Sequence, residues 1–193
     1  MMRRLLAVPS SVLVICLFLP ALRVCGHAEV PATFPPCYAA YLGGIGVVIV
    51  ALARVGASRL AAFGAAIPLA FIALTTGGLI AVWAACTGPI GSAIGIALGL
   101  GAVAAAVAIV RACVRKPPSE VTMATIALGQ AIVSIGWTGL LAFDREGMWG
   151  SYLALVAALA MAVGSLAWRS DAARRERDAT NQFPRAFARR LHA

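Results

Sequence analysis

The chain of 193 residues is poor in charge and in histidine. Charged residues make up 12% of it, with 7 Asp or Glu and 2 His. A soluble domain carries about 25% charged residues, and a disordered chain combines low hydrophobicity with high net charge. The composition therefore excludes both a disordered chain and an ordinary soluble domain.

Cysteine is also scarce, and the five cysteines form no Cys-x-x-Cys pair. This excludes a disulfide-dense secreted module. No His-Glu-x-x-His, Gly-x-Ser-x-Gly or P-loop motif occurs, and no paired carboxylates lie within the apolar runs. The sequence thus offers no recognised catalytic set, no cofactor motif and no metal-ligand cluster, and we expect a protein that is not an enzyme.

Apolar residues dominate instead, at 62% of the chain with a mean hydropathy of +0.92. A membrane-spanning helix needs about 20 mostly apolar residues. Six stretches meet or approach this length, and none contains Asp, Glu, Lys, Arg or His: 5–22, 38–53, 60–86, 90–110, 121–143 and 152–168. Runs such as 101–110 do not alternate apolar with polar residues, as the strands of a membrane barrel do. The sequence predicts an all-α, polytopic transmembrane bundle of six spans over 1–168, followed by a basic tail over 169–193.

The N-terminal stretch has an alternative interpretation. Arg3 and Arg4 followed by an apolar run and by Ala28 resemble a cleaved signal peptide, which would leave five spans. The apolar run has 18 residues, longer than the usual signal core of about 7–15. We therefore favour an uncleaved first helix.

The basic residues predict the orientation. With the N-terminus inside, all of the 16 Lys and Arg residues except Arg23 and Arg145 fall in cytoplasmic segments. Such asymmetry orients multi-pass proteins. We expect a protein of the cytoplasmic membrane with both termini in the cytoplasm. Aromatic residues agree, since several fall near the expected outer interface: Tyr38, Tyr41, Trp83, Phe143, Trp149 and Tyr152.

The net charge of +9 does not indicate nucleic-acid binding, because the basic residues follow the orientation rule and gather in the tail. Anionic lipid headgroups attract such a tail with about 1 kcal/mol per basic residue. We expect Arg185, Arg189 and Arg190 to face these headgroups.

Three cysteines map to the outer, oxidising side. Cys25 and Cys37 share a proline-rich connection, so a disulfide between them is expected, with Cys86 as an alternative partner. His27 lies near Cys25, but too few further ligands accompany it for a metal site. We expect His27 to be an exposed loop residue.

Two patterns predict helix packing. Gln130, Ser134 and Thr138 recur every four residues and form a polar seam within the membrane, with Thr75 and Thr76 as candidate partners. Gly91, Gly95 and Gly99 form a small-residue stripe that lets another helix approach closely.

Three functions remain open. The first is a non-enzymatic accessory or scaffold subunit that binds a membrane protein or a second copy of itself. The second is a carrier for a small neutral solute, in which the polar seam lines the path. The third is an outer-face thiol oxidoreductase that uses Cys25, Cys37 and Cys86.

Overall fold

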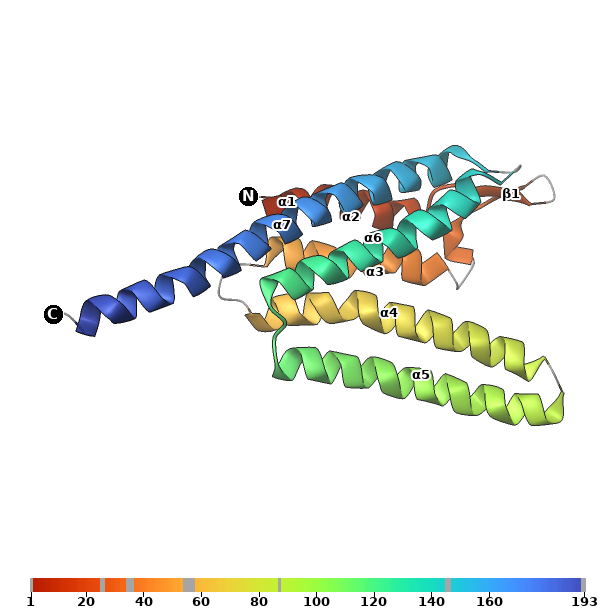
Figure 1. Ribbon diagram of the computed structural model, residues 1–193. Helices are drawn as coiled ribbons and strands as arrows, with labels where there is room; N and C mark the ends of the chain where they lie inside the picture. The colour runs from red at the N-terminus through yellow and green to blue at the C-terminus, as the bar shows by residue number, and fades with distance from the viewer. Residues whose placement is uncertain are drawn as a thin grey trace.

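The computed structural model describes residues 2–24, 27–33, 37–53, 58–86, 88–144 and 147–191. Most of these residues are helical, and the helices lie side by side in alternating directions (Figure 1). Both ends of the chain lie at the same end of the bundle, where the last helix extends past the others (Figure 1). The predicted all-α helical bundle is confirmed.

The elements follow one another in a simple order. They are α1 (Met2–Leu5), α2 (Ala7–Cys16), β1 (Leu22–Val24), β2 (His27–Glu29), the 3-10 turn η1 (Pro31–Thr33), α3 (Cys37–Leu52), α4 (Ser58–Ala85), α5 (Pro89–Arg115), α6 (Glu120–Ala142) and α7 (Trp149–Leu191). Ser119 caps α6 by accepting a hydrogen bond from the Thr122 N–H, and Glu120 lies in the first turn. The Pro117-Pro118-Ser119-Glu120 sequence therefore ends one connection and starts the next helix.

Within the described ranges, four helices are long and apolar enough to cross a membrane, by length and composition: α4, α5, α6 and α7. Two shorter apolar helices, α2 and α3, accompany them. Helix α7 does not end at residue 168, where the last apolar run ends. It continues as one helix to Leu191. No glycine or proline lies between Gly164 and Pro184, so nothing in that stretch ends the helix, and Pro184 itself lies within α7.

The first expected span, 5–22, is wrong in its C-terminal part. Helix α2 ends at Cys16, and Leu22 belongs to a short antiparallel hairpin. Pro20 explains the early end, because a proline disfavours helical backbone at the residue before it. Pro9 explains the break between α1 and α2, because it has no N–H to donate to the carbonyl of Leu5.

The hairpin is fixed to the start of α7. Two backbone hydrogen bonds connect it: Met148 N–H to Ala21 O at 2.9 Å and Gly150 N–H to Pro20 O at 3.1 Å. Ala21 N–H also donates to Glu29 O at 2.9 Å and extends the pairing within the hairpin. A Cβ at Gly150 would overlap the Pro20 carbonyl, so this contact needs glycine. The hairpin thereby holds the first and last helices together at the end of the bundle opposite the chain ends.

Helices α3 and α4 approach each other through glycines. A Cβ at Gly46 would overlap the carbonyl of Gly64. Pro68 leaves that carbonyl without its usual helical donor, because proline lacks an N–H. The unbonded Gly64 carbonyl of α4 lies against Gly46 of α3. The missing hydrogen bond in α4 and the missing side chain in α3 therefore occur at the same contact.

The main buried core lies among α2, α3, α6 and α7. Its largest side chains are Leu13, Tyr41, Met161 and Trp168. Helix α4 contributes Ala65 to this cluster, and no described residue of α5 belongs to it. Helix α5 packs against α4 at the side of the bundle (Figure 1).

Candidate functional site: a polar clamp between α3 and α6

Gln130 and Ser134 of α6 bind the backbone of α3. The Gln130 Nε2 donates to the carbonyls of Ala39 at 2.8 Å and Ala40 at 3.1 Å. The Ser134 hydroxyl lies 2.6 Å from the Ala40 carbonyl. Both side chains are fully buried. We call Gln130, Ser134 and the Ala39 and Ala40 carbonyls the polar clamp.

Gly43 makes room for the clamp. A Cβ at this position would overlap the side-chain amide of Gln130. Gly43 lies one turn beyond Ala39 and Ala40, so the bare face of α3 and the two accepting carbonyls coincide. The fit between α3 and α6 therefore depends on a missing side chain as much as on hydrogen bonds.

The other threonines expected to join the seam do not reach α3. Thr138 is buried, but its hydroxyl donates to the Ser134 carbonyl of its own helix at 2.7 Å. Thr75 likewise donates to Phe71 O at 2.8 Å, and Thr76 is exposed. The partner of Gln130 is thus the backbone of α3, and the expected partnership with Thr75 and Thr76 is wrong. Because every helix has carbonyls, no side-chain pattern could have identified this partner.

Three buried polar atoms have no hydrogen-bond partner among the described residues: Gln130 Oε1, Tyr41 OH and Ser165 Oγ. Gln130 therefore uses its amide nitrogen fully and leaves its oxygen unpaired. Tyr41, predicted to lie near the outer interface, is fully buried in the core.

The described cysteines carry free thiols, so the expected Cys25–Cys37 disulfide is not part of this structure. Cys25 itself lies outside the described residues. Cys37 is buried at the start of α3, where its sulfur accepts a hydrogen bond from Trp137 Nε1 at 2.9 Å. The alternative bridge to Cys86 is also absent, since Cys86 is an exposed free thiol at the far end of α4. The physical reason is that Cys37 faces the bundle interior and packs against α6.

The glycine stripe of α5 faces α4, the helix that precedes it in the chain. Gly91 and Gly95 are buried and Gly99 is half-buried. A Cβ at Gly99 would lie 3.8 Å from the Cβ of Ala81 on α4. The neighbour that the stripe admits is therefore a helix of the same chain.

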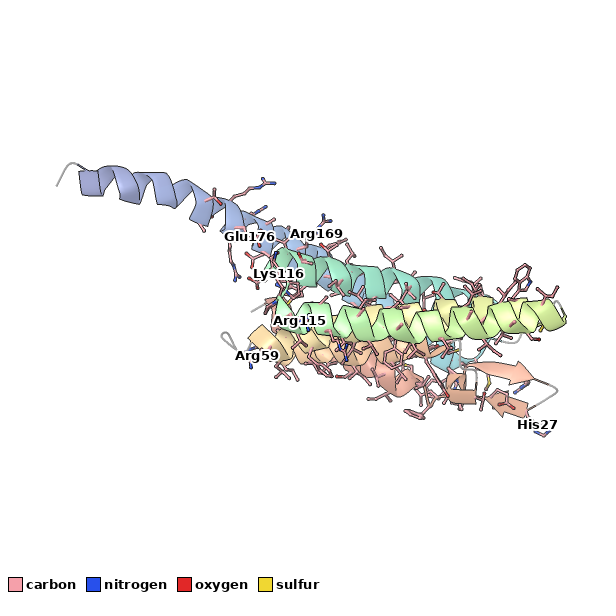
Figure 2. The ribbon with its side chains drawn as sticks, turned by 90° about the horizontal axis from the view of Figure 1, so that it is seen from below. His27, Arg59, Arg115, Lys116, Arg169 and Glu176 are labelled. Carbon is pink, nitrogen blue, oxygen red and sulfur yellow. The ribbon has the colours of Figure 1, made fainter. Side chains whose placement is uncertain are left out.

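The basic residues gather at one end of the molecule. Arg59, Arg115, Lys116 and Arg169 lie at the end where the chain termini lie, and His27 lies at the opposite end (Figure 2). His27 is exposed in the hairpin. Among the described residues, no three His, Cys, Asp or Glu side chains converge as a metal site would require. Arg185, Arg189 and Arg190 fall within α7, but their side chains lie outside the described part.

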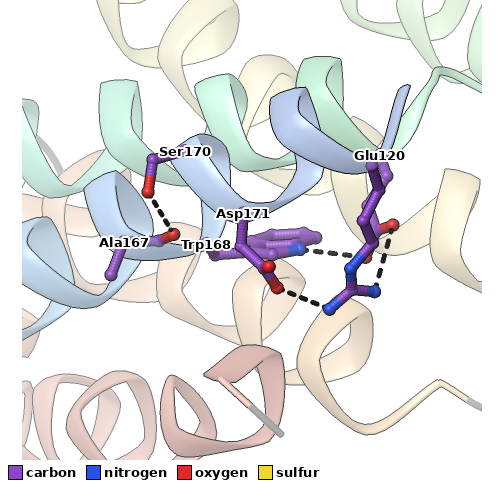
Figure 3. A network of polar contacts seen from close by, with 6 residues as sticks. Glu120, Ala167, Trp168, Ser170 and Asp171 are labelled. Carbon is purple, nitrogen blue, oxygen red and sulfur yellow. Dashed lines mark hydrogen bonds and ion pairs between the residues drawn. The ribbon is translucent and has the colours of Figure 1, made fainter. Parts of the chain in front are cut away.

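A small polar network joins α6 to α7 at this basic end (Figure 3). The Trp168 indole Nε1 donates to Glu120 Oε1 at 3.1 Å, and Arg175 lies 4.0 Å from Glu120 Oε2 while also pairing with Asp171. This network was not predicted from the sequence. Two features of the sequence could have indicated it: Glu120 at the start of a predicted helix, and Trp168 at the end of an apolar run.

Comparisons of the chain with protein-family models, with curated proteins and with solved structures found no match.

Proposed function

We propose that this protein is a non-enzymatic membrane protein that acts as an accessory or scaffold subunit, bound to another membrane protein or to a second copy of itself. The observation that carries this proposal is the polar clamp, because it uses the buried polar side chains of α6 for helix packing within the chain and not for a path that a solute could follow. Gln130 and Ser134, fully buried in α6, direct their donors to the backbone of α3. Polar side chains used in this way stabilise helix contacts by about 0.6–2 kcal/mol each.

The proposed location is the cytoplasmic membrane, with both termini in the cytoplasm. The grouping of Arg59, Arg115, Lys116 and Arg169 at one end supports this orientation (Figure 2), because basic residues beside membrane spans stay on the cytoplasmic side. The tail beyond residue 169 then lies where anionic headgroups attract its arginines.

The α4–α5 hairpin supports a binding role. Helix α5 packs on α4, while side chains on its other sides are exposed, including Ile96 and Leu100 at 67% each. A helix with one partner in its own chain leaves most of its surface for lipid or for another protein.

The test is purification in mild detergent followed by mass measurement in nanodiscs. We expect a dimer, or a complex with one membrane protein at fixed stoichiometry. Two variants then locate the contact, because a Cβ at Gly101 of α5 or Gly136 of α6 meets no atom within 4 Å. Gly101→Leu or Gly136→Leu should abolish the assembly while leaving the fold intact. A monomer without a partner in both detergent and nanodiscs refutes the proposal.

A carrier for a small neutral solute is the second candidate. It is favoured by the unpaired Gln130 Oε1 and Tyr41 OH, both fully buried, since such atoms could bind a polar solute. For a carrier, Gln130→Leu abolishes uptake into vesicles while thermal stability stays unchanged. For a scaffold, the same variant lowers stability, and assembly remains.

A further inference from the structure

An apolar groove runs along the second half of α4. It has a volume of ≈ 530 Å³ and is lined by Tyr38, Phe71, Leu74, Thr75, Gly78, Leu79 and Val82. The α4 residues recur every three or four positions and so form one continuous stripe. The groove lies apart from the polar clamp, which faces α6.

The groove is closed at one end by the contact between α3 and α4. Gly46, Gly64 and Pro68 bring the two helices together, and the groove begins one turn later at Phe71. At the other end it reaches Val82, which is 65% exposed. The groove therefore ends near the middle of α4 and is open at Val82, toward the end of the bundle where the β1–β2 hairpin lies.

The walls offer no free proton to a polar ligand. The Thr75 hydroxyl donates to Phe71 O at 2.8 Å, and the Tyr38 hydroxyl donates to Ala32 O at 3.0 Å. The remaining lining side chains are apolar or absent. The occupant is thus expected to be hydrocarbon.

The length of the groove matches the hydrocarbon of one membrane leaflet. From Phe71 to Val82 a helix rises about 16 Å, at about 1.5 Å per residue. Half of a hydrocarbon core of about 30 Å is about 15 Å. A transmembrane helix of a partner would need the full thickness, and a stable protein interface uses about 20–30 residues a side, whereas seven residues line this groove.

We propose that this groove binds one acyl chain of a phospholipid from the leaflet at the hairpin end. The inference is independent of the scaffold proposal, because it concerns α4 and a lipid rather than a protein partner. Gly78 provides the means to test it. A Cβ there meets no atom within 4 Å, so Gly78→Leu fills the groove without displacing the backbone.

The experiment uses the full chain in vesicles of phosphatidylethanolamine and phosphatidylglycerol that contain a phospholipid with a diazirine on its acyl chain. After irradiation, mass spectrometry maps the labelled residues. We expect labelling at 71–82 about tenfold above that on the exposed face of α5, which corresponds to about 1.4 kcal/mol of preference. Gly78→Leu should remove this excess.

Gly139→Leu is the matched control, because it adds the same side chain at an open position of α6. It should leave labelling at 71–82 unchanged. Val82→Phe, at the mouth of the groove, provides a second blocking variant should Gly78→Leu not fold. Equal labelling of α4 and α5, or labelling that survives both blocking variants, means ordinary boundary lipid and overturns the proposal. Absence of labelling at 71–82 in a chain that is a dimer overturns it in favour of a second copy that covers the groove.

Discussion

The core bundle of α2, α3, α6 and α7 and the α4–α5 hairpin are both built from apolar helices, yet they pack differently. In α6 and α7, 33% and 39% of the apolar windows are buried, against 17% and 11% in α4 and α5. The bundle contains the polar clamp and the large buried side chains, whereas the hairpin packs through glycine and alanine.

The difference shows what holds helices together when lipid surrounds them. Lipid tails are as apolar as leucine, so apolarity does not distinguish a buried helix face from an exposed one. Close approach and hydrogen bonds do. Where α6 places a glutamine against a bare stretch of α3, the two helices are fixed to each other. Where α5 presents a stripe of small residues, its main contact among the described residues is with α4.

Overfilling the clamp should have the largest effect. Gly43→Val places a side chain where the Gln130 amide lies, so we expect a loss of about 3 kcal/mol in unfolding free energy from overpacking and broken hydrogen bonds. Unfolding in detergent measures it. Gly101→Val in the hairpin is the control and should cost little. Combining Gly43→Val with Gln130→Ala should recover part of the loss, and strict additivity would contradict the proposed contact.

A substitution in the α4–α5 hairpin should have a smaller effect on stability, confined to these two helices. Gly95→Leu introduces bulk on the buried stripe of α5, with an expected cost of about 2 kcal/mol. Hydrogen exchange should then increase in α4 and α5 and stay unchanged in α6 and α7. Exchange that increases throughout the bundle would show that the two regions are not separate.

Removing the clamp donors without adding bulk should cost less again. Gln130→Leu loses the two hydrogen bonds to α3 and the one to Ser134, but it also removes the unpaired Oε1, so we expect a net loss of about 1 kcal/mol. The control is Thr125→Ala on the same helix, because Thr125 is exposed and bonds only to Val121 O. Equal stability of the two variants would argue against the clamp.

The exposed ion pairs at the basic end should matter least. Arg175 contacts Glu120 and Asp171, but its side chain is 60% exposed. Such pairs contribute about 0–1 kcal/mol and weaken with salt. Arg175→Ala should therefore lower stability by less than about 0.5 kcal/mol, and Arg174→Ala, on the exposed face of the same turn, should be neutral. A larger loss would mean that this network contributes substantially to the contact between α6 and α7.

Much of the fold could be predicted from the apolar runs, but the first span could not. A run of 18 apolar residues looks like a helix by hydropathy, while Pro20 ends it early and a hairpin follows. One half of the candidate site could be predicted: the spacing of Gln130 and Ser134 identified the α6 side of the clamp. The other side is a pair of backbone carbonyls, which no residue pattern can mark.

The sequence by itself determined that the chain is an all-helical bundle with long apolar helices, because apolar length and the absence of charge are local properties. The sequence also places most basic residues in alternate connections between the apolar runs, and the fold brings Arg59, Arg115, Lys116 and Arg169 to one end of the molecule. Only the tertiary structure decided that Gln130 bonds to α3, that the glycine stripe of α5 faces α4, and that Cys37 packs against Trp137. The reason is that one apolar helix face resembles another, so the choice of neighbour depends on which surfaces fit together in space.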